Sequence, residues 1–318
     1  MPTFAEVAGR TTTELARAAG AVCPMPSRAS MICIVGTRGA AISMATADGR
    51  PGMSAEDATF NTAVAHQARV YDYWLGGKDN YAADRDAAER AAAAYPGIRR
   101  GVRAQRAFLG NVVDYLAREQ GVRQFLDIGT GIPTANNTHE VAHGVDPDAR
   151  IVYVDNDPIV LAHARALLVG TREGTTSYLD TDLRETEKLL AGAAATLDFG
   201  KPVAVLLIGV LQIILDEDDP RGIVSRLMQA VPPGSWLALF HPANDVLADQ
   251  MAELLRQLNR NTATPQQLRS KPEILQFFDG LELQPPGLVQ VHRWMPGAEA
   301  PDMNDEIPGY AGLARKPG

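Results

Sequence analysis

From residue 124 onward, short apolar runs alternate with helix-forming segments, and this pattern constrains the 318-residue chain more than any other feature. Strands joined by helical crossovers run parallel, because each helix must return the chain to the same edge of the sheet. The pattern therefore predicts an open α/β fold, a mostly parallel sheet covered by helices on both faces. We expect strands at residues 125–128, 151–154, 176–179, 203–208 and 236–240, and helices at 137–142, 158–168, 185–194, 219–230 and 246–259.

The alternation breaks near the C-terminus. A short helix is expected at residues 272–278, followed by strands at 281–284 and 287–294 that Pro285-Pro286-Gly287 connects. A tight turn between two strands predicts an antiparallel hairpin. The sheet should therefore end in a C-terminal antiparallel hairpin, and residues 297–318 are expected to form a loosely packed tail.

The chain before the sheet divides into two parts. Residues 60–120 carry apolar side chains at helical spacing and predict a helical N-terminal region. Residues 1–59 are rich in small and polar residues, and Phe4 is their only aromatic residue. Such a segment cannot bury enough apolar surface to offset its ordering entropy, so we expect a disordered tail. Alternative start positions at Met31, Met44 and Met53 leave open whether this tail belongs to the mature protein.

Composition narrows the classes of function. The net charge of −8 argues against a general nucleic-acid binder, which needs clustered Lys and Arg. Cys23 and Cys33 are the only cysteines, so no disulfide framework is expected and a reducing cytoplasm is the plain interpretation. His and acidic residues do not cluster at ligand spacing, so no metal site is expected. No apolar run reaches the length of a membrane span, and no membrane partner is expected.

The first candidate site is the turn Asp127-Ile128-Gly129-Thr130-Gly131 at the end of the first strand. Two glycines let the chain turn tightly against a ligand. A dinucleotide site would require a third glycine where Thr134 stands, and Asp127 would repel a pyrophosphate. This acid instead suits a ligand that carries a cationic amine and a sulfonium. The alternative is a strand-ending turn with a solvated acid.

The second candidate site follows the next strand, at Asp155 and Asn156. A carboxylate at the end of this strand can accept hydrogen bonds from both hydroxyls of a ribose. Asp157 is the better candidate for a helix cap. The third site is Asp182 and Leu183 after the third strand, where they could hold an adenine. Either Asp180 or Asp182 could instead cap the helix that is expected to begin at Glu185.

Gln212 follows the fourth strand and could meet cofactor or substrate, since ligands lie outside the carboxyl ends of such strands. A role at the start of a helix is the alternative.

Several segments, in order, resemble an actinobacterial family of S-adenosylmethionine-dependent methyltransferases long catalogued as a domain of unknown function. The resemblance covers about residues 60–296. The matching segments are Ala68-Arg69-Val70-Tyr71-Asp72-Tyr73-Trp74-Leu75-Gly76-Gly77-Lys78-Asp79-Asn80-Tyr81, Gln124-Phe125-Leu126-Asp127-Ile128-Gly129-Thr130-Gly131, Val152-Tyr153-Val154-Asp155-Asn156-Asp157-Pro158, Asp180-Thr181-Asp182-Leu183-Arg184 and Phe277-Phe278-Asp279-Gly280-Leu281-Glu282-Leu283.

This resemblance implies a class I methyltransferase fold, with a Rossmann-like domain over residues 121–296 that binds S-adenosylmethionine. It also implies that residues 60–120 form a helical N-terminal lid, in which the segment containing Gly76, Gly77 and Asn80 closes over the cofactor. The family often has His where this chain has Gln212, so the role of that His as a base does not transfer. The family's substrates are unassigned.

Methyl transfer needs a base only if the acceptor must lose a proton. The weak candidates are His241, Glu140 and Tyr73, and His241 could also contact substrate. A histidine in the position of His241 is more often hydrogen-bonded by neighbouring backbone than catalytic. Tyr73 could instead belong to the apolar core of the lid.

We therefore expect a methyltransferase that acts on a small molecule. A non-catalytic regulatory protein that binds S-adenosylmethionine stays open, and an NAD(P)-dependent oxidoreductase is less favoured. The acceptor, the methylated atom and the oligomeric state are not determined by the sequence.

Overall fold

The structure is a computed structural model. The chain forms two compact units, Met1–Ala55 and Glu56–Gly318. The first unit contains β1 (Ile32–Cys33) and β2 (Met44–Ala45), which pair antiparallel. The rest of the tail expected over residues 1–59 lies outside the described residues. The structure describes residues 32–33, 44–45, 62–133, 136–168, 175–260, 262, 264–296 and 306–318.

The second unit is built on one sheet with the strand order β5-β4-β3-β6-β7-β10-β8, and β9 pairs with β10. The neighbouring strands from β5 through β4, β3 and β6 to β7 are parallel, whereas β10 is antiparallel to β7, β8 and β9. The predicted fold class is confirmed. The strands are β3 (Gln124–Ile128), β4 (Arg150–Asp155), β5 (Thr176–Asp180), β6 (Ala204–Ile208), β7 (Trp236–Pro242), β8 (Glu282–Leu283), β9 (Val289–Gln290) and β10 (Gly309–Arg315).

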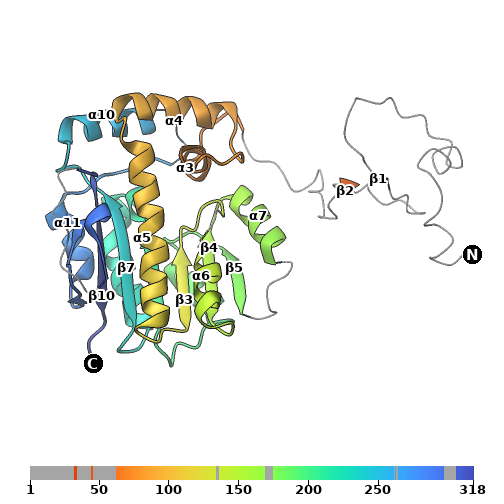
Figure 1. Cartoon of the computed structure of the whole chain (residues 1–318), viewed down its shortest axis with the longest axis vertical. Helices are drawn as coiled ribbons and strands as arrows, with labels where there is room; N and C mark the ends of the chain where they lie inside the picture. The colour runs from red at the N-terminus through yellow and green to blue at the C-terminus, as the bar shows by residue number, and fades with distance from the viewer. Residues whose placement is uncertain are drawn as a thin grey trace, which may run out of the picture. The chain divides into compact units, whose positions relative to one another are not determined.

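Helices cover both faces of this sheet, as the crossovers predict (Figure 1). α5 and α6 pack on one face, and α8 and α9 pack on the other. The helices of the unit are α3 (Gln67–Leu75), α4 (Ala82–Ala94), α5 (Ile98–Arg118), α6 (Thr138–Val145), α7 (Pro158–Leu168), α8 (Thr186–Ala193), α9 (Pro220–Ala230), α10 (Ala248–Leu258) and α11 (Lys271–Leu275), with 3₁₀ turns at Leu211–Ile213, Asp216–Asp218, Gln276–Phe278 and Val291–Arg293.

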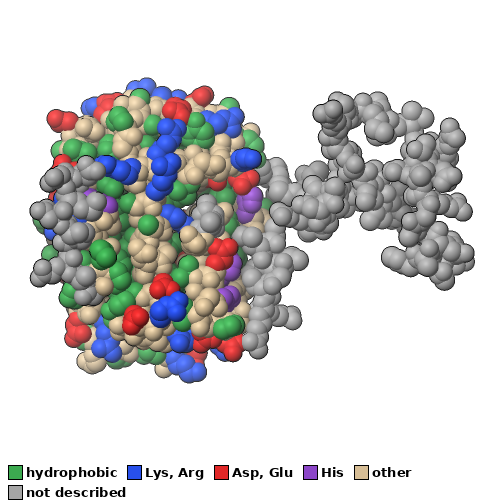
Figure 2. Space-filling model, viewed as in Figure 1, with side chains coloured by type: hydrophobic (Ala, Val, Ile, Leu, Met, Phe, Trp, Pro, Cys, Tyr) green, Lys and Arg blue, Asp and Glu red, His purple; other side chains and the backbone are tan. Residues whose placement is uncertain are grey.

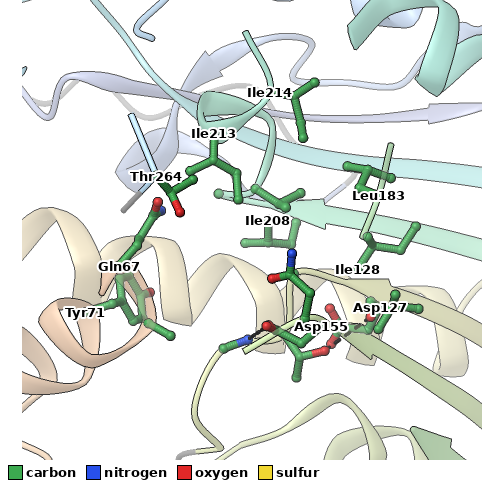
Figure 3. Close-up of a pocket in the computed structure, with 18 of the residues that line it drawn as sticks. Gln67, Tyr71, Asp127, Ile128, Asp155, Leu183, Ile208, Ile213, Ile214 and Thr264 are labelled. Carbon is green, nitrogen blue, oxygen red and sulfur yellow. Dashed lines mark hydrogen bonds between the residues drawn. The ribbon is translucent and has the colours of Figure 1, made fainter. Parts of the chain in front are cut away.

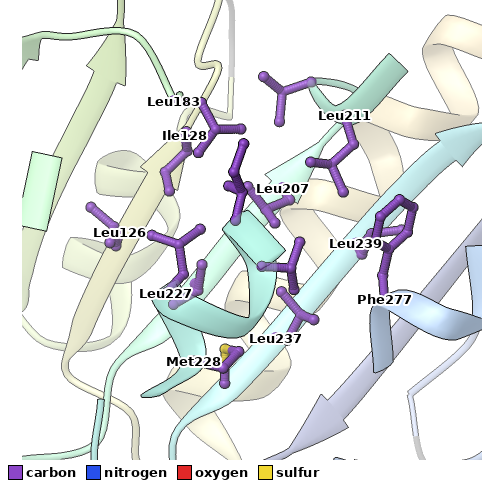
Figure 4. Close-up of a cluster of buried hydrophobic side chains, with 14 of the residues drawn as sticks. Leu126, Ile128, Leu183, Leu207, Leu211, Leu227, Met228, Leu237, Leu239 and Phe277 are labelled. Atoms are coloured by element: carbon purple, nitrogen blue, oxygen red, sulfur yellow. The ribbon is translucent and has the colours of Figure 1, made fainter. Parts of the chain in front are cut away.

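Strand side chains alternate between two apolar cores because successive residues point to opposite faces. Leu126 contributes to the core under α9, and its neighbour Phe125 contributes to the core under α5. Figure 4 shows the first of these cores, where Leu227 and Met228 of α9 lie against side chains of the strands. Every residue of β3 is buried, and three of the five, Phe125, Leu126 and Ile128, are apolar.

The residues expected to form a lid divide between two structural roles. α5 is a long amphipathic helix whose buried face, including Phe108 and Val112, covers the sheet. α3 and α4 instead pack with α10, a helix from much later in the chain, in an apolar cluster of their own. In Figure 1 these three helices lie across one end of the sheet. They position the side chains that face the carboxyl ends of the strands.

The expectation of a loose tail over residues 297–318 is wrong for residues 309–315. These residues form β10, which pairs with β7 over its whole length. All of its residues are buried except Arg315, which is exposed. Two glycines and two alanines give the segment weak strand propensity, so the sequence pattern did not reveal it. The glycines have a packing role, since a Cβ at Gly309 would lie 2.6 Å from the ring of Phe240.

The C-terminal strands are antiparallel, as expected, but their partner differs from the predicted one. β8 and β9 each pair with β10 and not with each other. The hairpin turn predicted at Pro285-Pro286-Gly287 therefore connects two strands that flank β10 on the same side. Each of them pairs instead with β10, which lies in the segment that was expected to be a loosely packed tail.

None of the described helices is long and apolar enough to cross a membrane.

The position of β10 inside the sheet predicts that its side chains stabilise the fold. Leu313→Ala should lower the free energy of unfolding by about 2–5 kcal/mol, because Leu313 is almost fully buried between helix and sheet. Leu275→Ala is the matched control, since Leu275 is 46% exposed and should cost less than about 0.5 kcal/mol. Urea unfolding of both variants measures the difference. Equal effects would show that residues 309–315 do not form a core strand.

Candidate functional site

The turn after β3 approaches its neighbours so closely that glycine is required. Gly129 and Gly131 have φ angles of +75° and +65°, in the region that residues with a Cβ rarely adopt. A Cβ on Gly129 would also lie 2.5 Å from Val210 after β6. The Gly129 backbone N–H donates to the carbonyl of Val154 at 2.8 Å, which holds the turn against β4.

Asp127 is buried beneath this turn and lines the cavity that the turn helps to enclose. The hydroxyl of Thr138 donates to its Oδ2 at 2.6 Å. Burial raises the pKa of Asp127 to about 6, although the hydrogen bond from Thr138 and the nearby Arg106 guanidinium oppose that shift. A buried carboxylate of this kind gains from a cationic ligand, which restores part of the lost solvation.

Asp155 ends β4 and connects the backbone of two turns. Its Oδ2 accepts from the N–H of Gly131 at 2.8 Å, and its Oδ1 accepts from the N–H of Asp157 at 2.9 Å. Each oxygen keeps a further lone pair that can accept from a ligand hydroxyl. Burial raises the pKa of Asp155, so hydrogen-bond donors from a ligand are favourable here as well.

Asp182 follows β5, the strand that pairs with β4 next to Asp155. Its Oδ2 accepts from the side-chain amide of Asn156 at 2.9 Å, and its carboxylate also pairs with Arg184. The buried side chain of Leu183 supplies an apolar surface beside these polar groups. The loops after β4 and β5 therefore offer hydrogen-bond acceptors and an apolar contact surface together.

These loops enclose a cavity of about 290 Å³ at the carboxyl ends of β3, β4, β5 and β6, here called the first cavity. Its wall includes every predicted residue of the three strand-end sites: Asp127, Gly129, Thr130, Gly131, Asp155, Asn156, Asp182 and Leu183. Figure 3 shows Gln67 and Tyr71 of α3 on one side of it, and Asp127 and Asp155 at the strand ends on the other. The volume is at the lower end of the range for small-molecule sites.

Helix side chains that the sequence did not single out complete the wall. Arg106 of α5 lines the first cavity and donates to Oδ1 of Asn137 at 2.8 Å. Its neighbour Gln105 donates through Nε2 to the carbonyl of Ile208 at 3.0 Å, which fixes α5 to the end of β6. Gln105 follows Val102 by three residues and precedes Leu109 by four, so it interrupts an apolar stripe. This polar residue within an apolar stripe is the sequence feature that could have indicated a role for Gln105 in the site.

His66 and Asp157 form a pair at the edge of the first cavity. His66 Nδ1 lies 2.7 Å from Oδ2 of Asp157, and His66 lines the cavity. The other oxygen of Asp157 accepts from the N–H of Ile159 at 2.8 Å, so Asp157 caps α7 as the sequence indicated. A carboxylate that holds one ring nitrogen of a histidine orients the ring and leaves the other nitrogen to take a proton.

A second cavity of about 100 Å³ adjoins the first. The two share four wall residues, His66, Gln67, Tyr71 and Gln105. The second cavity extends between α3, α5 and α10, and Gln212 is part of its wall. Gln212 is therefore near the site, but in the second cavity and not in the first.

The other predicted residues line neither cavity. His241 is fully buried, with Nδ1–H donating to the Pro242 carbonyl at 2.7 Å and Nε2 accepting from Arg269 at 3.0 Å. Burial lowers the pKa of His241 to about 3. Glu140 accepts from the N–H of Asn137 at 2.8 Å in a capping box. These partners leave His241 and Glu140 with structural roles.

The remaining predicted residues are Tyr73 near the end of α3 and residues of the connection from α3 to α4. Tyr73 donates through its hydroxyl to Glu89 at 2.6 Å on the surface. Asn80 donates to Oδ2 of Asp72 at 2.8 Å and to the carbonyl of Gly77 at 3.1 Å. Gly76 ends α3 in the left-handed region. In this structure the segment forms a compact loop around Asp72 and lies outside the walls of both cavities.

No cluster of His, Cys, Asp and Glu that could hold a metal ion occurs among the described residues.

The chain matches the model of the S-adenosyl methyltransferase family over residues 53–317. No curated protein matches it. Among solved structures, a DUF574 family protein from Streptomyces avermitilis is 43% identical, with 80% of this chain and 99% of that chain covered and a TM-score of 0.76. A protein from Thermobifida fusca named as a candidate methyltransferase is 38% identical, with 81% and 96% covered and a TM-score of 0.74.

The close packing of the glycine turn predicts different costs for two similar substitutions. Gly129→Ala and Gly131→Ala both place alanine at a positive φ, but only the former clashes with Val210. A Cβ on Gly131 would meet no atom beyond its chain neighbours within 4 Å, so Gly131→Ala is the matched control. Gly129→Ala should lower the free energy of unfolding by about 1–3 kcal/mol more than Gly131→Ala in urea. Equal losses would contradict the close contact between the turn and Val210.

Proposed function

The chain belongs to the S-adenosyl methyltransferase family, and we propose that it methylates a small molecule held beside the first cavity. It is an enzyme that uses S-adenosylmethionine as methyl donor. The family match gives no support to an NAD(P)-dependent oxidoreductase or to a non-catalytic binding protein. The observation that carries the proposal is the first cavity, which gathers three separate strand-end acids around one enclosed space.

The chemistry of the wall fits the donor from one end to the other. Asp155 is suited to the ribose hydroxyls, and Asp182 with Leu183 is suited to the adenine edge and face. Asp127 is suited to the ammonium of the methionine part, and the guanidinium of Arg106 is suited to its carboxylate. With the donor in this order, we expect its sulfonium methyl to face the wall that the two cavities share.

The bound donor supplies an electrophilic methyl group: the acceptor's lone pair forms a bond to the methyl carbon as the carbon–sulfur electron pair returns to sulfur. The protein mainly positions the two reactants and excludes water. Tyr71 and Gln105 contribute by closing the space between α3, α5 and β6, where each is tied to a backbone carbonyl.

An acceptor that loses a proton needs a group to receive it, and His66 is placed for this role. The shared wall contains one histidine and one tyrosine, His66 and Tyr71. The Tyr71 hydroxyl donates to the Val102 carbonyl at 3.2 Å. Burial raises the pKa of Tyr71 well above the ordinary value of a tyrosine, so its hydroxyl keeps its proton. His66 is held by Asp157 at Nδ1, which leaves Nε2 for the proton.

A small-molecule acceptor also agrees with the surface of the described residues. On the face seen in Figure 2, acidic and basic side chains are interspersed. The net charge of the chain is −8. A nucleic-acid acceptor would favour a broad basic surface beside the site. The enclosed walls of the first cavity instead support an acceptor small enough to enter between the helices.

Asp155→Asn tests the assignment of the ribose partner. S-adenosylhomocysteine should bind this variant about tenfold to a hundredfold more weakly than the unmodified protein, because hydrogen bonds to a charged acceptor are lost. Asp180→Asn is the control: Asp180 ends the adjacent strand in register with Asp155, but it is exposed. Calorimetry measures all three affinities. Equal binding by both variants, or no binding by the unmodified protein, would refute the assignment.

The raised pKa of Asp127 predicts a pH-dependent affinity. With a pKa of about 6, the carboxylate that attracts the ammonium is mostly neutral at pH 5. S-adenosylhomocysteine should therefore bind about tenfold more weakly at pH 5 than at pH 7. Asp127→Asn should bind weakly at both pH values and lose most of this dependence. Asp155 faces the same cavity with a raised pKa and accounts for the remainder.

The free protein should respond to pH in the opposite sense. Because burial raises the folded pKa of Asp127 above its ordinary value, the neutral form favours the folded state. That stabilisation is complete at acidic pH, below the ordinary pKa of an aspartate, and is lost as the pH rises through about 6. Asp127→Asn should remove this contribution to the pH dependence in urea unfolding between pH 4 and pH 7. A variant with the unmodified pH profile would show that Asp127 titrates normally.

A further inference from the structure

The second cavity is lined mostly by apolar side chains from elements that are distant in sequence. Its volume is about 100 Å³, and it lies where α3, α4, α5 and α10 meet the end of β7. The apolar side chains of its wall include Val70, Trp74, Phe240, Met251, Leu254 and Ile307. A space of this kind favours an apolar guest, because the guest leaves water without breaking hydrogen bonds of the protein.

No Asp, Glu, Lys or Arg side chain is part of this wall among the described residues. A carboxylate, a phosphate or an ammonium placed here would lose its hydration without gaining an ionic partner. The first cavity differs, since Asp127, Asp155, Asp182 and Arg106 all line it. The two adjoining spaces therefore suit ligands of opposite character, one charged and one neutral.

Gln212 gives the second cavity a specific polar contact. The residue is only 5% exposed, and its Nε2 donates to the carbonyl of Gly209 at 2.6 Å. Its Oε1 is buried without a hydrogen-bond partner in the protein. Buried acceptors are nearly always paired, so an unpaired one in a cavity wall indicates a donor supplied by a ligand. Gln67 Oε1, in the wall shared by both cavities, is also buried without a partner.

The backbone of Gln212 is held rigidly. The buried guanidinium of Arg269 donates to the carbonyls of Leu211 at 3.0 Å and Ile214 at 2.9 Å, on either side of it. The Gln212 carbonyl accepts from the N–H of Gln267 at 2.7 Å. A side chain fixed in this way can select a ligand by hydrogen bonding without a cost of reorganisation. His241 supports the arrangement by accepting from Arg269.

We propose that the second cavity binds the methyl acceptor, and that this acceptor is a neutral, mostly apolar molecule of about one ring with a hydroxyl or N–H group that donates to Gln212. The inference rests on the proposed function, because it assigns the substrate class of the same enzyme. The size is limited by the volume: about 100 Å³ is less than the roughly 150 Å³ of an engineered cavity that holds benzene in another protein, so the acceptor part held here is no larger than one small ring. The shared wall places such a molecule beside the sulfonium end of the donor.

Three small probes test this assignment on the protein loaded with S-adenosylhomocysteine. Phenol has a ring and a donor, toluene has the ring alone, and benzoate carries a charge. Ligand-observed NMR titration should show phenol binding at least tenfold more tightly than benzoate. Gln212→Leu should weaken phenol binding about tenfold and leave toluene binding unchanged, because only phenol uses the buried acceptor.

Gln229→Leu is the matched control, since Gln229 is exposed on α9 and donates to Ser225. It should bind all three probes like the unmodified protein. Calorimetry of S-adenosylhomocysteine accompanies each titration, and Gln212→Leu should keep its full affinity because Gln212 does not line the first cavity. Retained affinity also shows that the variant is folded.

The outcomes separate the two claims. Failure of the unmodified protein to bind S-adenosylhomocysteine would overturn the proposed function and the inference with it. If S-adenosylhomocysteine binds but benzoate binds as tightly as phenol, the neutral character of the acceptor site is refuted alone. This comparison uses the unmodified protein and stands even if Gln212→Leu does not fold. Phenol binding that Gln212→Leu leaves unchanged would refute the role of Gln212.

Discussion

The carboxylate of Asp155 is the interaction on which the site depends. It accepts from Gly131 in the turn after β3 and from Asp157 in the turn after β4, so one side chain fixes two loops that belong to different strands. The parallel register of β3 and β4 brings these loops to the same edge of the sheet. Asp157 then caps α7 and contacts His66 before α3. Strand ends, covering helices and the cavity between them are thus connected through adjacent carboxylates.

The contrast between the two cavities gives this arrangement its chemical meaning. Buried acids surround the first cavity, and burial raises the pKa of both Asp127 and Asp155, so a polar cationic ligand relieves an unfavourable environment there. The second cavity has mostly apolar walls and a rigid acceptor at Gln212 that has no partner in the protein. His66 and Tyr71 belong to both walls. Methyl transfer between a charged donor and a neutral acceptor fits this division.

The sheet and the strand-end acids could be predicted from the sequence because both depend on local patterns. The apolar residues of β3 and the acid that precedes its glycines are continuous in the chain, and that acid lines the first cavity. β10 could not be recognised, because glycine and alanine give it weak propensity and its partner β7 lies far earlier in the chain. His66, Arg106 and Gln105 were missed because helix packing, rather than local sequence, decides where they point. His241 was selected for its position after a strand, but the backbone of Pro242 and the side chain of Arg269 occupy both of its nitrogens.

A crystal structure of the protein with S-adenosylhomocysteine tests the central claim most directly. The account predicts ribose hydroxyls within hydrogen-bond distance of Asp155, and a sulfur atom directed at the wall formed by His66, Gln67, Tyr71 and Gln105, with the second cavity still open beyond it. A nucleoside bound away from Asp155, or a sulfur atom directed away from the shared wall, would contradict the account.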